Sequence, residues 1–158
     1  MNILFTTRDE WFSNNIRKMT KAPVSHCALE FPEYGFILHS NIRGIHLEWS
    51  KNFRRKNKVI YEINILSDRE TDFDKIDKLL KLYEFKPYDK KAISYLAIYM
   101  FLKNTCHISL PKHNLWQTTG MFLCTEWVTK YLDGKEDSMI TPYKLYLRLK
   151  NEEQNGRL

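Results

Sequence analysis

The sequence predicts a single α+β domain in which an antiparallel sheet packs against helices. Three observations favour this fold class. The first half of the chain holds short segments in which apolar and polar residues alternate, which is typical of strands. The second half changes to apolar residues three and four positions apart, which is typical of amphipathic helices. The chain has 158 residues, the length of one ordinary domain that can bury its own core.

Five strands are expected in the first half, at residues 2–7, 24–31, 36–40, 44–49 and 58–66, with a short helix over residues 10–20. Alternation within 24–31 places His26 and Cys27 on opposite faces of the sheet. Residues 33–35, Glu-Tyr-Gly, are expected to form the tight turn of a hairpin between the second and third strands.

The helical half begins at residues 71–85 and continues at 90–104. The apolar face expected for the first of these helices consists of Phe73, Ile76, Leu79, Leu80 and Tyr83. A loop with Pro111 and Gly120 precedes a helix that carries Cys124, for which Gly134 is the expected C-terminal cap. The last helix is expected to start with Thr141 as N-cap and Pro142 at its first position.

The basic segment 51–58, Lys-Asn-Phe-Arg-Arg-Lys-Asn-Lys, holds much of the formal net charge of +6. One interpretation is a solvated loop or turn between strands. The other is contact with an anionic surface such as nucleic acid, anionic lipid or an acidic polymer. The segment does not interleave aromatic and basic residues in the way of a recognisable nucleic-acid module.

The sequence predicts a cytoplasmic location and one structured unit. We find no apolar run of membrane-spanning length and no signal-peptide pattern at the N-terminus. Three widely spaced cysteines do not suggest a disulfide framework. We therefore expect a domain at residues 1–150, followed by a disordered tail at 151–158, where apolar periodicity ends.

Cys124 has two interpretations. Trp127, Val128 and Tyr131 share its helical face, which favours a small core residue. Its place near the expected helix start favours a nucleophile, because unpaired N–H groups and the helix dipole there lower the pKa of a thiol. The same N–H groups can donate to a developing oxyanion.

A nucleophilic thiol needs a base, and His26 and His39 are the histidines on neighbouring expected strands. If both share a face, His39 can orient His26. A packed strand histidine is the alternative for His26, and the uncertain turn length leaves the shared face open. Cys106, His107 and His113 form a weak candidate metal site because a fourth ligand is missing. We therefore expect neither a metal ion nor another cofactor.

Four short motifs follow each other along the chain: Ser-His-Cys-Ala-Leu at 25–29, Ile-Leu-His-Ser at 37–40 with Gly-Ile-His-Leu-Glu-Trp at 44–49, Phe-Leu-Cys-Thr-Glu-Trp-Val at 122–128, and Thr-Pro-Tyr-Lys-Leu at 141–145. Their order resembles that of the circularly permuted papain-like cysteine amidohydrolases of the NlpC-like clan, which also contains the lecithin retinol acyltransferase group. The opening residues 3–26 and Lys-Pro-Tyr-Asp at 86–89 are also similar to elements of this family. The resemblance covers roughly residues 2 to 147 and rests mostly on order and spacing.

The resemblance implies a permuted papain-like fold with Cys124 as nucleophile, His26 as general base and His39 as the orienting residue. Many relatives have Glu at the third position, whereas the acyltransferase group has His, so His39 leaves the substrate class open. Thr125 stands where relatives often have Ser or Glu.

Gln117 and Tyr88 are two further candidate site residues, and each has a structural alternative. Gln117 is a candidate second oxyanion donor or a solvated loop residue. Tyr88 is a candidate for lining the cleft or for packing.

The resulting hypothesis is a cysteine hydrolase that attacks an amide bond, most plausibly an amidase or endopeptidase of peptidoglycan-type peptides. One alternative is a thioesterase or lipid acyltransferase on the same fold. Another is a binding protein without catalysis that uses residues 51–58 to contact an anionic partner. The expected partners are therefore a peptide, a peptidoglycan fragment or a lipid-like acyl substrate, with an anionic surface as a further candidate.

Overall fold

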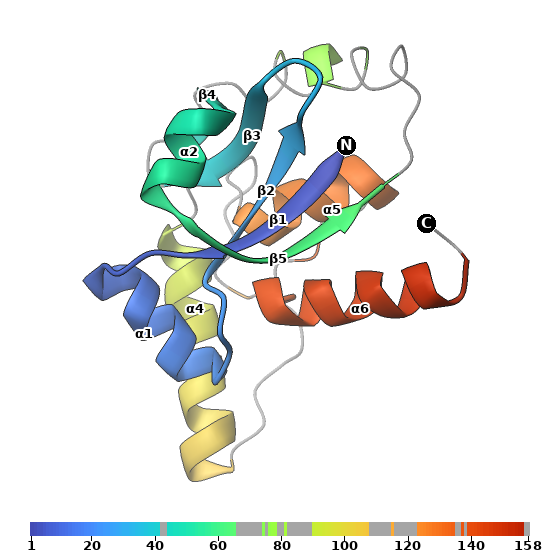
Figure 1. Ribbon diagram of the computed structural model, residues 1–158. Coiled ribbons are helices and arrows are strands. Elements are labelled where there is room, and N and C mark those ends of the chain that lie inside the picture. Colours follow the sequence, from blue (N-terminus) through green and yellow to red (C-terminus); the bar gives the residue numbers. More distant parts are fainter. Residues whose placement is uncertain are drawn as a thin grey trace.

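The chain forms an open sheet of five strands in the order β4-β3-β2-β1-β5, and neighbouring strands run antiparallel (Figure 1). The strands are β1 (Asn2–Thr7), β2 (His26–Phe31), β3 (Phe36–Asn41), β4 (Gly44–Trp49) and β5 (Lys58–Asn64). All five expected strands are present, and the α+β class with an antiparallel sheet is confirmed. The second strand begins two residues later than expected, at His26.

The helices are α1 (Trp11–Thr20), α2 (Ser50–Lys56), α4 (Lys90–Phe101), α5 (Cys124–Asp133) and α6 (Pro142–Gln154), and a π-helical segment (Leu102–Cys106) follows α4. This computed structural model describes residues 1–41, 44–65, 74, 76–78, 81, 90–107, 115, 123–134, 137 and 139–156. Most of the helix expected at 71–85 and the loop with Pro111 and Gly120 therefore lie outside the described residues. In the part of the chain that is described, we find no helix with the length and apolarity needed to cross a membrane.

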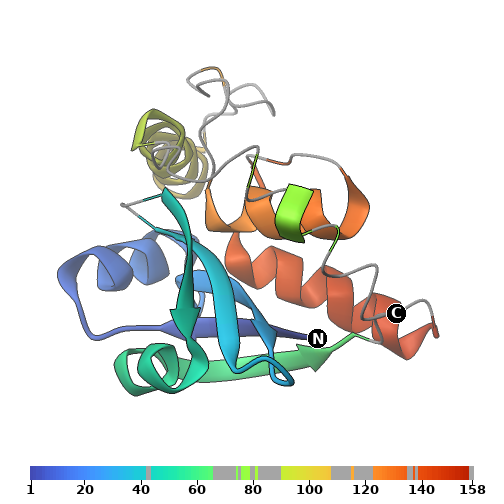
Figure 2. The same cartoon turned by 90° about the horizontal axis from the view of Figure 1, so that it is seen from above.

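The two faces of the sheet are covered by different helices (Figure 2). Helix α5 packs on β2 and β3, and α6 packs on β1 and β5, around the larger apolar core. Cys27, Leu29 and Leu38 point into this core. Helix α2 covers the opposite face, where Phe53 packs with Leu4, Ala28 and Ile37.

The basic segment 51–58 is mostly helical, which corrects the expected loop or turn between strands. The sequence shows no helical spacing of apolar residues here, because Phe53 is the one buried residue of this seven-residue helix. Phe53 anchors α2 to the sheet, and Arg54, Arg55 and Lys56 in the last turn complement the negative end of the helix dipole.

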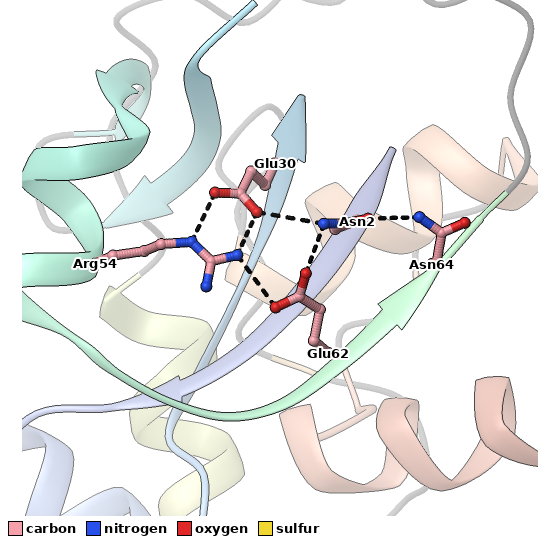
Figure 3. Close-up of polar contacts among 5 residues, drawn as sticks. All are labelled: Asn2, Glu30, Arg54, Glu62 and Asn64. Carbon is pink, nitrogen blue, oxygen red and sulfur yellow. Dashed lines mark hydrogen bonds and ion pairs between the residues drawn. The ribbon is translucent and has the colours of Figure 1, made fainter. Parts of the chain in front are cut away.

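Arg54 ties α2 to the sheet through a network of polar side chains (Figure 3). Its guanidinium Nε and Nη2 donate to both carboxylate oxygens of Glu30 on β2, at 2.8 and 2.5 Å. Nη2 also pairs with Glu62 on β5 at 3.1 Å, and Asn2 donates to both carboxylates. Asn64 donates to Asn2 at 2.8 Å. Through these contacts, α2 is linked to β1, β2 and β5 by the side chains of Arg54, Asn2, Glu30 and Glu62.

The end of α5 and the start of α6 lie where the sequence predicts. Gly134 follows α5 with a φ of 69°, a left-handed conformation that glycine adopts without the strain of a side chain. The Thr141 hydroxyl accepts a hydrogen bond from the N–H of Lys144, and Pro142 begins α6. Helix α6 continues to Gln154, so residues 151–154, expected in a disordered tail, are helical. Their exposure explains why apolar periodicity gave no sign of them.

Candidate active site

Cys124 is the first residue of α5, within the first helical turn as the sequence predicts. Its thiol is 5% exposed and lies at a helix terminus whose first N–H groups have no partners within the helix. The buried carboxylate of Glu126 accepts a hydrogen bond from the N–H of Leu123 at 2.7 Å. This bond fixes the backbone that enters the helix, and with it the position of Cys124.

His26 and His39 lie side by side on the face of the sheet that α2 covers. His26 Nε2 is 3.3 Å from His39 Nδ1, and the two rings meet edge to face with 5.4 Å between their centroids. Phe53 packs against both rings, at 6.2 and 5.0 Å between centroids. The register that pairs Phe31 with Phe36 brings the two histidines together across the hairpin.

Cys27 and His26 are the two groups that act on the Cys124 thiol. The hydrogen bond from Cys27 lowers the pKa of the Cys124 thiol most; burial opposes this, and the charge and hydrogen bond of His26 lower it further. The net pKa of Cys124 lies well below its ordinary value. Burial raises the pKa of Cys27, which keeps that thiol protonated as the donor.

His39 is neutral at physiological pH. Burial lowers the pKa of His39 to about 2, and the neighbouring groups His26, His46 and Lys56 contribute to this shift. A neutral ring has one protonated and one unprotonated nitrogen, so His39 Nδ1 can accept a hydrogen bond from His26 Nε2. With Nε2 directed at His39, the other ring nitrogen of His26, Nδ1, remains for Cys124.

Two cavities adjoin this cluster, and Ser25 and Ile16 line both. The larger cavity has a volume of about 680 Å³ and is lined by His26, His39, His46 and Glu48 among others. The smaller, of about 30 Å³, borders Cys124 and is lined mainly by apolar side chains. The sulfur and the imidazole rings therefore border neighbouring cavities.

The structure thus brings together all three residues of the expected triad, His26, His39 and Cys124. The other two sequence candidates, Tyr88 and Gln117, lie outside the described residues. The same holds for His113 of the weak metal candidate at 106–113.

Sequence reasoning missed three neighbours of this cluster: Cys27, His46 and Glu48. Period-two spacing puts His46 and Glu48 on one face of β4, and this signal was present in the sequence. Their position beside His39 follows from the register between β3 and β4, which pairs His39 with His46. For the contact between Cys27 and Cys124 we find no signal in the sequence.

No protein-family model matches this chain, and a search of curated proteins gave no significant match.

Proposed function

We propose that this protein is a cysteine hydrolase that cleaves an amide bond by nucleophilic acyl transfer. Cys124 is the nucleophile, His26 the general base and His39 the residue that orients His26. The observation that carries the proposal is the 3.3 Å contact between His26 Nε2 and His39 Nδ1, made by the ring that also lowers the pKa of the Cys124 thiol. A lowered thiol pKa at a helix N-terminus supports it, because the thiolate is the reactive form.

The proposed reaction starts with transfer of the Cys124 thiol proton to His26 Nδ1. The resulting imidazolium donates through Nε2–H to His39 Nδ1, which holds the ring in position. The thiolate attacks the substrate carbonyl, and the N–H groups of the first turn of α5 stabilise the oxyanion. His26 then protonates the departing amine, which leaves an acyl-cysteine thioester. In the second half, His26 takes a proton from water, which hydrolyses the thioester and releases the acid and the thiol.

The proposed fold is the circularly permuted papain-like arrangement. The supporting order is His26 on β2, His39 on β3 and Cys124 at the start of α5, with the base before the nucleophile in the chain. The same order is the basis of the resemblance to the NlpC-like clan. We propose this arrangement as the finer description of the α+β fold.

The substrate we favour is a peptide amide with a small group next to the scissile carbonyl, as in peptidoglycan-type peptides. The cavity that borders Cys124 has about 30 Å³, which accommodates roughly two water-sized groups. Leu96, Met100, Leu123 and Ile140 give it an apolar lining. An alanine-sized side chain suits this volume better than a fatty acyl chain does.

A thioesterase or lipid acyltransferase on the same fold is the second candidate. The observation that favours it is a pair of exposed apolar side chains at the larger cavity, Phe12 at 43% and Leu47 at 46% exposed. Phe12 and Leu47 line that cavity. Such side chains suit an acyl chain or a lipid surface.

Binding of an anionic partner without catalysis is weakened by the contacts of α2. Two of its last-turn cations are engaged within the chain, Arg54 with Glu30 and Glu62, and Lys56 with Glu48. An anion would have to compete with these carboxylates. Salt-sensitive binding to an acidic polymer that Cys124→Ser leaves unchanged would revive this alternative.

The test is incubation with a panel of muropeptides and lipid acyl donors, read by mass spectrometry for products and for an acyl adduct on Cys124. We expect muropeptide cleavage by the wild type and none by Cys124→Ala, whereas Cys106→Ala, at an exposed cysteine, keeps full activity. An adduct formed from lipid donors alone would favour the acyltransferase. Hydrolysis that survives Cys124→Ala would refute the proposed nucleophile.

A further inference from the structure

Three potential metal ligands converge beside the proposed triad, on the face of the sheet that α2 covers. They are His39, His46 and Glu48, and one donor atom from each lies within 4.8 Å of the other two. His39 and His46 are direct register partners on β3 and β4, with 4.3 Å between ring centroids. Glu48 follows His46 by two residues and therefore shares its face.

His39 Nε2 points into this cluster and has no hydrogen-bond partner among the described residues. The His39 side chain is 5% exposed, so leaving its Nε2 without a hydrogen bond lowers the stability of the fold. Its nearest anionic atom is Glu48 Oε2 at 3.6 Å, which is too long for a hydrogen bond. In a tetrahedral zinc site with ligand bonds near 2.1 Å, however, two donor atoms lie roughly 3.4 Å apart. The separation therefore suits two ligands of one ion.

His46 has the proton arrangement of a metal ligand. Its Nδ1 is 3.0 Å from the carbonyl oxygen of Gly44, an acceptor, so Nδ1 carries the proton. Nε2 then holds a lone pair, which faces the amide Nδ2 of Asn41 at 3.4 Å, a long contact that a metal ion would replace. Metal-binding histidines usually donate their second ring N–H to a carbonyl or carboxylate in this way.

Glu48 can serve a metal ion while keeping its ion pair. Its Oε1 binds Lys56 Nζ at 2.5 Å, and Oε2 is the oxygen that faces His39. The cluster lines the larger cavity of about 680 Å³, which leaves space for a water molecule as the fourth ligand. Two histidines, a carboxylate and one open position are a ligand set that zinc commonly takes.

We propose that His39, His46 and Glu48 bind a divalent metal ion of the zinc type, with His39 shared between this site and the proposed triad. The metal site itself does not depend on the proposed hydrolase activity. It is distinct from the segment 106–113 that the sequence had suggested.

The test is zinc binding by isothermal titration calorimetry in a Cys124→Ala, Cys106→Ser background, which removes two competing thiols. We expect one zinc ion per chain. His46→Ala and Glu48→Gln should each weaken binding at least about tenfold, since even indirect partners of metal ligands cost that much. His107→Ala is the matched control, because His107 is exposed and lies outside the cluster.

Circular dichroism and thermal melting show whether each variant is folded. Tetrahedral cobalt(II), read by its visible absorption, is the second probe, and a thiolate charge-transfer band should be absent. Binding of unchanged strength in folded His46→Ala and Glu48→Gln variants would overturn the proposal. So would the absence of any zinc binding in the background protein.

A consequence for catalysis rests on the proposed function. With a metal ion on Nε2, the proton of His39 moves to Nδ1 and is donated to His26 Nε2. His26 then carries its own proton on Nδ1, facing Cys124, and cannot accept the thiol proton. Bound metal therefore blocks the base.

Half-inhibition of hydrolysis by zinc should require at least about ten times more zinc in His46→Ala than in the wild type. Equal inhibition would place the inhibiting ion on Cys124 and refute this coupling. Failure of the proposed function is recognised separately, by hydrolysis that survives Cys124→Ala without zinc. The binding experiment uses a protein without the Cys124 thiol and is unaffected by that outcome.

Discussion

The reactivity of Cys124 is set by two neighbours that both lower the pKa of its thiol. Cys27 is fully buried, which raises the pKa of its own thiol, and it lowers the pKa of Cys124, as His26 also does. Burial alone would make Cys124 an inert thiol. The contacts outweigh burial, so the same apolar surroundings that suggest a core residue instead hold the sulfur in place.

Selective labelling follows from this environment. At about pH 6 an ordinary cysteine is almost entirely protonated, whereas the lowered pKa of Cys124 gives it a larger thiolate fraction. Iodoacetamide, followed by peptide mass spectrometry, should modify Cys124 faster than Cys106, although Cys106 is the exposed thiol. Cys27 should stay unmodified in the folded protein, because it is buried and its pKa is raised. Faster labelling of Cys106 would contradict a lowered pKa at Cys124.

The orienting role of His39 depends on one atom, Nδ1, and this can be tested with Asn. The amide oxygen of Asn can take the place of Nδ1 as acceptor for His26, whereas Ala cannot. We expect His39→Ala to lower kcat by about 100-fold or more and His39→Asn to restore part of that loss. Thermal melting of both variants separates this effect from loss of packing against Phe53. Equal activity of the two variants would indicate a packing role alone.

At the scale of elements, α2 matters more to the site than its basic composition suggested. Phe53 packs on the rings of His26 and His39, and Lys56 holds Glu48 in place beside His39. Arg54 joins α2 to Glu30 on β2, whose side chain is 5% exposed. A helix expected as a solvated loop therefore forms one wall of the site.

The Arg54 network predicts an acid-sensitive stability. Burial would raise the pKa of Glu30, but the hydrogen bonds and charge of Arg54 lower it overall below 4.5. The unfolded chain then binds more protons than the folded one as pH falls from about 4.5, so the stabilisation is lost on acidification. Arg54→Met should lower the free energy of unfolding by ~2 kcal/mol at pH 7 and by less at pH 3.

Urea denaturation at both pH values measures this difference. Arg55→Met is the control on the same helix, because Arg55 is exposed, and it should change stability by less than about 0.5 kcal/mol. An Arg54→Met effect of the same size at pH 3 and pH 7 would show that lost packing of the arginine stem, and not the ion pair, is responsible.

At the scale of the whole molecule, the sequence predicts those features that depend on neighbours in the chain. Alternation located the strands, and Gly134, Thr141 and Pro142 located helix ends, because strand faces and caps are local properties. Contacts set by the pairing of distant segments could not be predicted. The hairpin register decides whether His26 meets His39, and the docking of α5 decides that Cys27 meets Cys124.

Helix α6 completes the large core, and this predicts where the chain can be shortened. Leu145 and Leu149 are buried, and Tyr146 stacks on Tyr61 of β5 with 4.0 Å between ring centroids. A chain ending at residue 150 keeps all of them and loses only a largely exposed turn and the weak Arg148–Glu152 pair. It should lose no more than about 1 kcal/mol.

A chain ending at residue 141 also loses both buried leucines, at roughly 2–5 kcal/mol each, which is comparable to the whole stability of a domain. Thermal unfolding should therefore be cooperative for the chain ending at 150 and absent for the chain ending at 141. Iodoacetamide selectivity for Cys124 provides a second measurement, because it should survive the first truncation and disappear with the second. A cooperative transition in the chain ending at 141 would show that the sheet and α5 form a core without α6.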